Sequence, residues 1–428
     1  MKKVLAATMV LVFLISLSAC GKTSTPLLTP TNETEVTTET ETKIVPEGKK
    51  GTLEIWTMFT GADGEAFPTI VNMYNATNPD YTVVHRAMEA NDLYLKLQIA
   101  VSSGEGIPDM AMNHIERIPL FQEEGKVMDL TPYLTEAGIE KENYNAKSWS
   151  MTDIAGGHYA VPLDIHSFVL WVNMDLYEKY GITDLDDDVL TWDEFAKTAE
   201  VVKKDSVIPM GLSWLRPIFL SSYAQLGGKL SDDGTVPSFD NDIAKQVLTQ
   251  YTSMVKAGNT QVDGDDPFKA FLGGNVLYMP EGCWTLNAVR DSGLNIKAFD
   301  FPVFDANIKG NWTSSHQITI PENPNADPER IKASMEFIKF VGENSIGWSA
   351  AGLVPSHISV TMDDTFNQLP QAFLATENEE LKIYDYKYYG YAVEALDKVL
   401  GDIIFNKISI EEGLKQAFTE TKDKIEMG

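Results

Sequence analysis

The sequence is poor in cysteine and in arginine. Its 428 residues include two cysteines, Cys20 and Cys283, which is too few for a disulfide scaffold or for a zinc site built from cysteines. Only five residues are arginine, and 34 lysines and arginines stand against 62 acidic residues, for a formal net charge of -28. Surfaces that bind nucleic acid or anionic lipid need clustered cations, so we expect no nucleic-acid partner and no membrane contact made by charge alone.

The motifs of common enzyme classes are also missing. The sequence contains neither a G-x-S-x-G elbow nor a G-x-x-x-x-G-K phosphate loop. Acidic residues are so numerous that some pair would lie at glycosidase distance by chance, so none can be assigned a catalytic role. We therefore expect no enzyme, no cofactor and no bound metal. His114, His166 and His316 in particular lack the local spacing of a shared metal site.

The N-terminus has the features of a bacterial lipoprotein signal. Lys2 and Lys3 precede an apolar run at 4–17, which is too short for a typical spanning helix. The run ends in LSAC, which resembles a lipobox, so we expect residues 1–19 to be a signal peptide and Cys20 to be lipidated. An ordinary signal or an uncleaved anchor is the alternative. Residues 20–50 are rich in threonine and glutamate and without aromatics, and we expect a flexible tether there.

From residue 51 onward, strand-like and helical patterns alternate. Strands are expected at 52–57, 82–86, 110–112, 168–172, 276–279, 296–301 and 315–320. Helices are expected at 66–74, 92–101, 327–341 and after a capping box that begins at Thr191, and the chain reads as almost entirely helical from 342. This rhythm predicts an α/β fold with largely parallel sheets. The acidic run at 184–188 is expected to be a solvated loop, with a calcium site as the alternative.

Aromatic and polar residues adjoin these strands, where ligands of open α/β sheets bind. The candidate ligand-binding residues are Trp56, Phe59, Asp63, Asn113, His114, Asp164, His166, Trp214, Glu281, Trp284, Trp312 and His316. An indole can stack on the C–H face of a sugar while carboxylates, amides and imidazoles bind its hydroxyls, so the mixture suits a neutral sugar. Each of these residues could instead pack in a core or cap a helix, and the scarcity of arginine argues against a phosphate or sulfate ligand.

A set of short segments occurs in a characteristic order along 51–424. They are LEIW at 53–56, GIPDM at 106–110, GKVMDLTP at 125–132, YAVP at 159–162, WVNMDLY at 171–177, TWDEF at 191–195, MPEGCW at 279–284 and AAGLVPS at 350–356. In this order they resemble family 1 extracellular solute-binding proteins, the sugar receptors of bacterial ABC importers. The resemblance implies a type II periplasmic-binding fold, with two α/β lobes joined by a hinge and the ligand cleft between them.

The resemblance also implies an arrangement of the chain and a role. The N-terminal lobe would comprise 51–164 plus about 316–355, and the C-terminal lobe 165–315 plus about 356–428. A lipid-anchored monomer at the extracellular face of the bacterial cytoplasmic membrane would close on its ligand and deliver it to the permease subunits of an ABC importer. The number of aromatic candidates favours an oligosaccharide over a monosaccharide.

Other functions remain open at this stage. One alternative is a receptor for a small non-carbohydrate solute, such as a polyol or an amine, which would suit the acidic composition. The others are a surface polysaccharide-active enzyme and an adhesion protein.

Overall fold

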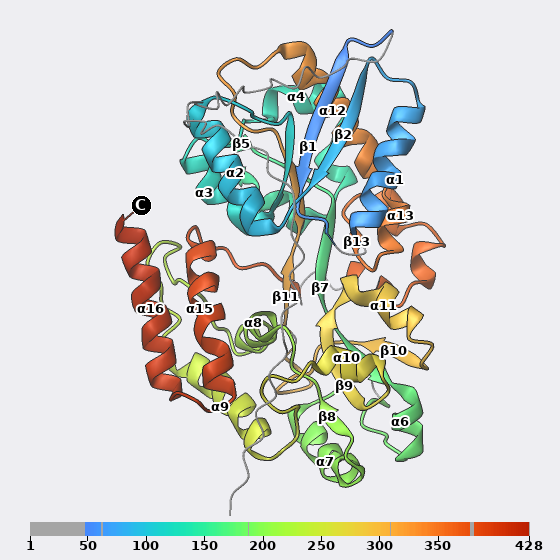
Figure 1. The fold of residues 1–428 in the computed structure, drawn as a ribbon, viewed down its shortest axis with the longest axis vertical. Coiled ribbons are helices and arrows are strands. Elements are labelled where there is room, and N and C mark those ends of the chain that lie inside the picture. The colour runs from blue at the N-terminus through green and yellow to red at the C-terminus, as the bar shows by residue number, and fades with distance from the viewer. Residues whose placement is uncertain (1–47, 61–62, 187, 309, 377–380, 428) are drawn as a thin grey trace, which may run out of the picture. The chain divides into compact units, whose positions relative to one another are not determined.

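The computed structural model describes residues 48–60, 63–186, 188–308, 310–376 and 381–427 (Figure 1). The chain divides into two units, 1–44 and 45–428, and every described residue belongs to the second. The expected signal peptide, the expected lipidation site Cys20 and all of the expected tether except 48–50 lie outside the described residues. Within the described ranges, no helix is both long enough and apolar enough to span a bilayer.

The first sheet has five strands in the order β2-β1-β3-β12-β6. Its strands are β1 (Gly51–Thr57), β2 (Tyr81–Ala87), β3 (Met110–His114), β6 (Val161–Pro162) and β12 (His316–Thr319). β1 pairs in parallel with β2 and β3. β12 comes much later in the sequence than the other four strands and runs antiparallel to β3 and β6.

Helices α1 (Asp63–Ala76) and α2 (Ala90–Ser103) connect the parallel strands, as the alternating pattern predicts. α1 buries Phe67, Ile70, Val71 and Tyr74, whose spacing of three and four residues places them on one face. That face packs with β1 and with α12 (Pro328–Glu343) in one apolar core. The part of the first sheet formed by β1, β2 and β3 is thus parallel and connected by helices as the sequence pattern indicates, whereas β12 pairs antiparallel with β3 and β6.

The second sheet has seven strands and is centred on β7 (Asp164–Asn173), all ten residues of which are buried. Its other strands are β8 (Ile208–Met210), β9 (Val276–Gly282), β10 (Ile296–Phe299), β11 (Asn311–Ser314), β13 (Val354–Pro355) and β14 (Leu381–Lys382). β9, β10, β11 and β13 all run antiparallel to β7. The prediction of largely parallel sheets is wrong for this sheet. A strand buried on both faces shows no alternation, so its pattern does not reveal the direction of its partners.

Two short passages carry the chain between the sheets. β6 ends at Pro162 in the first sheet and β7 begins at Asp164 in the second. β11 ends at Ser314 in the second sheet and β12 begins at His316 in the first. β7 and β11 run side by side between the two parts of the molecule (Figure 1). The predicted lobe boundaries near 164 and 315 stay a prediction, but both fall close to these passages.

The remaining elements surround the two sheets. They are β4 (Asp153–Ile154), β5 (Gly157–His158), α3 (Ile118–Glu123), α4 (Thr131–Ala137), α5 (Ala146–Ser150), α6 (Met174–Lys179), α7 (Trp192–Val202), α8 (Leu215–Gln225), α9 (Asp242–Lys256), α10 (Pro267–Leu272), α11 (Leu286–Asp291), α13 (Ile346–Ser349), α14 (Ile358–Thr361), α15 (Tyr389–Ile404) and α16 (Ile410–Met427), with short 3₁₀ turns between some of them. The chain after 342 is therefore not almost entirely helical. β13 and β14 have only two residues each, too few to show a strand period.

Three local predictions from the sequence can be compared directly with the structure. The capping box is confirmed: the Thr191 hydroxyl oxygen accepts from the Glu194 amide at 3.3 Å, and the Glu194 carboxylate accepts from the Thr191 amide at 3.0 Å. The acidic run is not wholly a solvated loop, since Asp184 accepts a hydrogen bond of 2.7 Å from the buried Tyr278 hydroxyl. Cys283 is fully buried and free.

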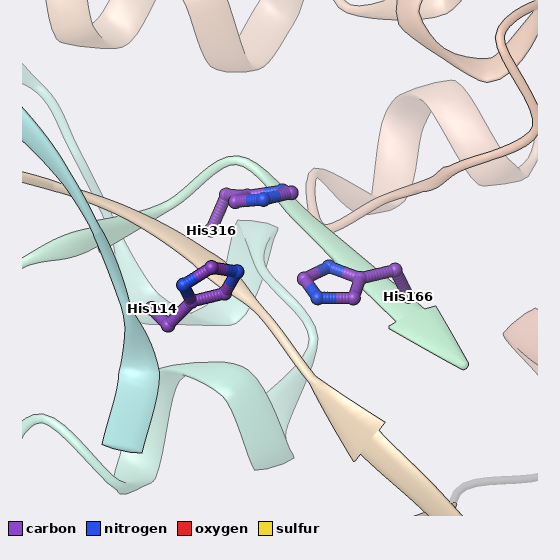
Figure 2. A group of neighbouring side chains, drawn as sticks. All are labelled: His114, His166 and His316. Carbon is purple, nitrogen blue, oxygen red and sulfur yellow. The ribbon is translucent and has the colours of Figure 1, made fainter. Parts of the chain in front are cut away.

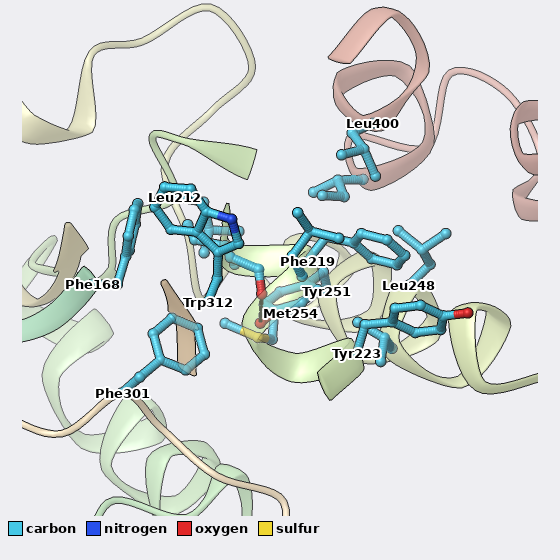
Figure 3. Packing of buried hydrophobic residues seen from close by; sticks show 14 of the residues in the cluster. Phe168, Leu212, Phe219, Tyr223, Leu248, Tyr251, Met254, Phe301, Trp312 and Leu400 are labelled. Carbon is cyan, nitrogen blue, oxygen red and sulfur yellow. Dashed lines mark hydrogen bonds between the residues drawn. The ribbon is translucent and has the colours of Figure 1, made fainter. Parts of the chain in front are cut away.

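The apolar core of the second sheet is rich in aromatic side chains (Figure 3). Phe168 of β7 lies edge-to-face with Trp312 of β11, with ring centroids 6.1 Å apart. Phe219 and Tyr223 of α8 stack with centroids 5.2 Å apart.

Candidate functional site

A cavity of about 450 Å³ lies between residues of the first sheet and residues of the second. Strands β3 and β12 supply one side, and the starts of α8 and α15 supply part of the other. The structure brings together the following sequence-predicted residues in its wall: Asp63, His114, His166, Trp214, Trp284, Trp312 and His316.

Five predicted residues lie outside the cavity wall. Phe59 and Asn113 are buried, Phe59 against Trp348 and Asn113 donating to the Thr319 hydroxyl at 2.8 Å. The Trp56 indole, on β1, donates to Glu54 at 2.6 Å.

Asp164 and Glu281 are the other two, and both lie buried behind the residues that line the cavity. Asp164 has no exposed surface, and Glu281 is buried within β9, where it accepts from the Ser213 hydroxyl. Glu281 is part of the strand rather than of the segment after it, so its carboxylate faces protein and not the cavity. Burial raises the pKa of Glu281 to about 7.

Three tryptophans form an aromatic wall. Trp284 meets Trp214 and Trp312 edge-to-face, with ring centroids 6.3 and 6.4 Å apart. Trp214 is 51% exposed, whereas Trp312 is 6% exposed and donates through its indole N–H to the Tyr389 hydroxyl at 3.0 Å. Trp214 therefore presents an open face for stacking, while Trp312 supports the wall from behind.

Sequence reasoning missed much of the polar lining. The missed residues include Tyr94, Glu116, Arg117, Arg216, Tyr389 and Asp397. The Arg216 Nε lies 3.0 Å from both carboxylate oxygens of Asp397, and the Arg117 guanidinium lies 4.6 Å from the centre of the Tyr94 ring. The predicted candidates adjoin strands, whereas Arg117 ends a 3₁₀ turn and Arg216 lies in the first turn of α8. Arg117 comes three residues after His114, and Arg216 two residues after Trp214, which is the signal that could have found them.

The arginine count is thus a poor guide to the cavity. Two of the chain's few arginines line it, together with the acidic residues Asp63, Glu89 and Glu116. Arg216 is already paired with Asp397. The lining offers donors and acceptors of both charges to a ligand, rather than a purely anionic surface.

Three histidines converge in the cavity wall (Figure 2). His114 and His316 are direct partners across β3 and β12, and His166 follows on β7 opposite Ser314 of β11. One ring nitrogen of each histidine lies within 4.8 Å of the others. The sequence offered no local spacing for this group, because the strand register of two sheets creates it.

Asp164 holds two of these rings from behind. Its carboxylate accepts from His166 Nδ1 at 3.0 Å, from His316 Nδ1 at 2.7 Å and from the indole N–H of Trp348 at 2.7 Å. Burial opposes its ionisation, but the charge on His316 and these hydrogen bonds outweigh burial and hold the pKa of Asp164 well below its usual range. Asp164 is therefore an ionised, positioning group.

The same environment shifts the pKa values of the three histidines in different directions. Burial lowers the pKa of His114 and of His166, and their neighbouring imidazoles lower it further. For His316, burial acts downward, but the Asp164 carboxylate outweighs it and raises the pKa. His114 is consequently neutral at neutral pH and keeps a lone pair on one ring nitrogen.

Comparison with known proteins gives one family match and several distant relatives. A family model described as bacterial extracellular solute-binding protein matches residues 69–374. The arabinooligosaccharide-binding protein of Bacillus subtilis (strain 168) is 26% identical over 219 residues, covering 49% of this chain and 48% of the relative. The maltotriose-binding protein of Pyrococcus abyssi is 24% identical over 272 residues, covering 61% and 56%. The chain spans about half the length of the curated relatives it matches.

Solved structures agree in fold. The GacH receptor of Streptomyces glaucescens matches with a TM-score of 0.76 at 18% identity, over 88% of this chain and 98% of that one. The cyclic alpha-maltosyl-1,6-maltose binding protein of Arthrobacter globiformis matches with a TM-score of 0.71 at 18% identity, over 88% and 99%. These likenesses show the architecture: two α/β lobes of the type II periplasmic-binding fold, as the resemblance of the sequence segments implies.

Proposed function

Because the chain belongs to the bacterial extracellular solute-binding proteins, we propose that it captures a neutral oligosaccharide in the cavity and delivers it to an ABC importer. The family comprises binding proteins rather than enzymes. The observation that carries the proposal is the aromatic wall, in which an open indole face at Trp214 adjoins Trp284 within a cavity that also holds hydroxyl-binding side chains.

The lining favours a sugar on chemical grounds. Sugar hydroxyls both donate and accept, and the wall offers Asn91, Tyr94, Ser314 and the histidines, which do the same. A volume of about 450 Å³ lies within the range of ~300–1,000 Å³ that is common for small-molecule clefts. The names of the relatives cited above, for arabino-oligosaccharides and maltotriose, support a ligand of more than one ring.

Capture would proceed by closure of the two lobes. The passages at Leu163 and Ser315 are each one residue long and link the sheets. A hinge needs only a few residues that absorb the change in backbone angles. Closure would bring the side of the cavity that carries His114 toward the side that carries Trp214, and would exclude water from the ligand.

The location follows from the N-terminal sequence. We propose that lipid on Cys20 anchors a monomer to the extracellular face of the bacterial cytoplasmic membrane, with 21–47 as a tether. The tether expected at 20–50 is wrong for its last residues, because the Lys50 amide donates to the Asp80 carbonyl at 2.8 Å. A flexible chain of about 27 residues spans roughly 30 Å root-mean-square. Such a reach suits transfer of the closed lobes to permease subunits. Mass spectrometry of the mature N-terminus would test the lipid directly: an unmodified Cys20 excludes the anchor.

A second candidate ligand is a small amine. Asp63, Glu89, Glu116, Glu394 and Asp397 all line the cavity, and carboxylates would pair with an ammonium group. A polyol fits the same hydroxyl-binding groups but leaves the tryptophan wall without a role.

A thermal-shift panel followed by calorimetry separates these ligands. The panel contains arabino-, malto-, xylo-, manno- and β-gluco-oligosaccharides, polyols and polyamines. We expect a stabilising shift with one oligosaccharide series. Trp214→Ala should weaken its binding by about tenfold or more, or about 1.4 kcal/mol, whereas Trp56→Ala should leave the affinity unchanged because Trp56 lies outside the wall. A shift with an amine alone would overturn the sugar proposal.

A further inference from the structure

Three histidine rings from two sheets meet in the cavity wall, and we propose that His114, His166 and His316 bind a divalent transition-metal ion of the zinc class. One nitrogen from each ring lies within 4.8 Å of the others. Imidazole is a preferred ligand of zinc, copper and nickel ions. Zinc–nitrogen bonds of about 2.0–2.1 Å in a tetrahedral site place ligand nitrogens roughly 3.4 Å apart, so the nitrogens need to approach by up to about 1.4 Å. The ring planes of His114 and His166 tilt by 39° and 32° from that of His316, so the rings also need to turn toward a common point.

The hydrogen bonds behind the rings match those of a metal site. Nδ1 of His166 and Nδ1 of His316 both bond to Asp164, and Nδ1 of His114 lies 2.5 Å from the Tyr94 hydroxyl. Metal-binding histidines commonly have one nitrogen held by a carboxylate or another polar group, which orients the ring and leaves the other nitrogen for the metal. Here that other nitrogen is Nε2, for which the described residues supply no hydrogen-bond partner.

The charge balance also favours a cation at this point. Asp164 has no exposed surface, and within the described ranges its ion pairs are with His166 and His316 alone. A buried carboxylate is costly unless a nearby positive charge compensates it. Without a metal, the charge on His316 compensates Asp164; a divalent ion held by the three imidazoles displaces that proton and supplies the positive charge in its place. The nearby carboxylates of Glu116 and Asp63 favour a cation at this point, whereas Arg117 and Arg216 disfavour it.

The position of the site gives the ion a structural role. His114 and His316 belong to the first sheet and His166 to β7 of the second, so the ion bridges the two lobes beside the passages that link them. Three protein ligands leave the fourth tetrahedral position open. Because all three histidines line the cavity, that position is available to water or to a ligand hydroxyl.

Metal binding is tested on the tag-free full chain after treatment with a chelator. Zn²⁺ is titrated in competition with a chromophoric chelator at neutral pH, without any sugar. We expect one ion per chain with a dissociation constant in the micromolar range or below. His114→Gln should weaken binding at least tenfold, and His357→Gln, a histidine outside the cluster, should not.

Binding of several weak ions that His114→Gln leaves unchanged would overturn the proposal, since the many carboxylates of the chain could produce it. A Co²⁺ titration of the unaltered protein keeps the test valid if the variants fail to fold. Three imidazoles and an open position should give the intense visible bands of four-coordinate Co²⁺, and a spectrum like that of the hydrated ion would contradict the site. Neither readout depends on the sugar, so the proposed function can fail or succeed separately.

Discussion

Trp284 lies where three apolar clusters of the molecule meet, and Gly282 makes its position possible. The indole packs against the cores of both sheets and against the smaller cluster around Cys283. A Cβ atom at position 282 would lie only 2.1 Å from the Trp284 ring. The backbone angle of Gly282 is ordinary for any residue, so the need for glycine here comes from close approach and not from chain conformation.

Gly282→Ala should therefore displace the Trp284 ring. We expect ligand affinity to fall about tenfold, or about 1.4 kcal/mol, together with a shift of the tryptophan emission maximum in the free protein. Calorimetry and fluorescence check both. Gly273→Ala is the matched control, since a Cβ atom there meets its nearest neighbour at 3.4 Å. Equal affinities for the two variants would show that the wall tolerates the displacement.

Glu281, beside this glycine, makes the stability of the protein depend on pH. Burial raises its pKa from 4.5 to about 7. The folded state then holds more protons than the unfolded state between these values, so this group's contribution to stability is complete below pH 4.5 and is lost as pH rises through 7. The loss amounts to about 3 kcal/mol.

Glu281→Gln removes this loss. The variant should unfold at a higher temperature than the parent at pH 8, and the difference should shrink toward pH 5. Thermal unfolding at the two pH values measures it, with the exposed Glu178→Gln as control. An advantage that is the same at both pH values would contradict the assignment.

At the scale of elements, pattern strength decides what the sequence reveals. α1 was predictable because four buried residues recur at helical spacing, and α7 because Thr191 and Glu194 form a capping box. β13 and β14 were not, since two residues cannot show a period. The antiparallel partners of β7 were missed because a fully buried strand has no alternation to read.

The residues of the candidate site also differ in how far the sequence predicts them. Tryptophans and histidines beside predicted strands were found. Arg117 and Arg216 were missed because they lie in helical turns, Arg117 at the end of a 3₁₀ turn and Arg216 in the first turn of α8. The meeting of His114, His166 and His316 depends on the register of β3 with β12 and of β7 with β11. No spacing within the sequence encodes that register.

The capping box allows a test at this scale. Thr191→Ala removes the side-chain acceptor for the Glu194 amide and should cost about 1 kcal/mol of unfolding free energy. Urea denaturation measures the change. Thr249→Ala, at an exposed position within α9, serves as the control because its hydroxyl donates only to the Lys245 carbonyl and caps no helix end. A Thr191→Ala variant as stable as this control would show that Glu194 alone suffices to start α7.

For the whole molecule, the two sheets are joined at few points and the cavity lies between them. Ligand binding across that cavity should bring the lobes together, because both sides gain contacts only when the hinge closes. Each lobe has its own apolar core, and Trp284 packs against both.

Small-angle X-ray scattering measures this closure. The radius of gyration of the full chain should fall on addition of the oligosaccharide that the thermal-shift panel identifies. Trp214→Ala at the same ligand concentration should show a smaller fall, in proportion to its lower occupancy. An unchanged radius at saturating ligand would mean that the lobes are already closed or that capture needs no hinge.

The reactivity of the buried Cys283 thiol can report local opening of the protein core. Burial raises its pKa to about 12, so almost no thiolate is present at neutral pH, and the side chain has no exposed surface. It sits in the apolar cluster beside β7 and β9, next to Trp284 in the sequence. A thiol reagent can therefore reach it only when this region of the core opens. The rate of labelling then measures how often the region opens, with and without a ligand in the neighbouring cavity.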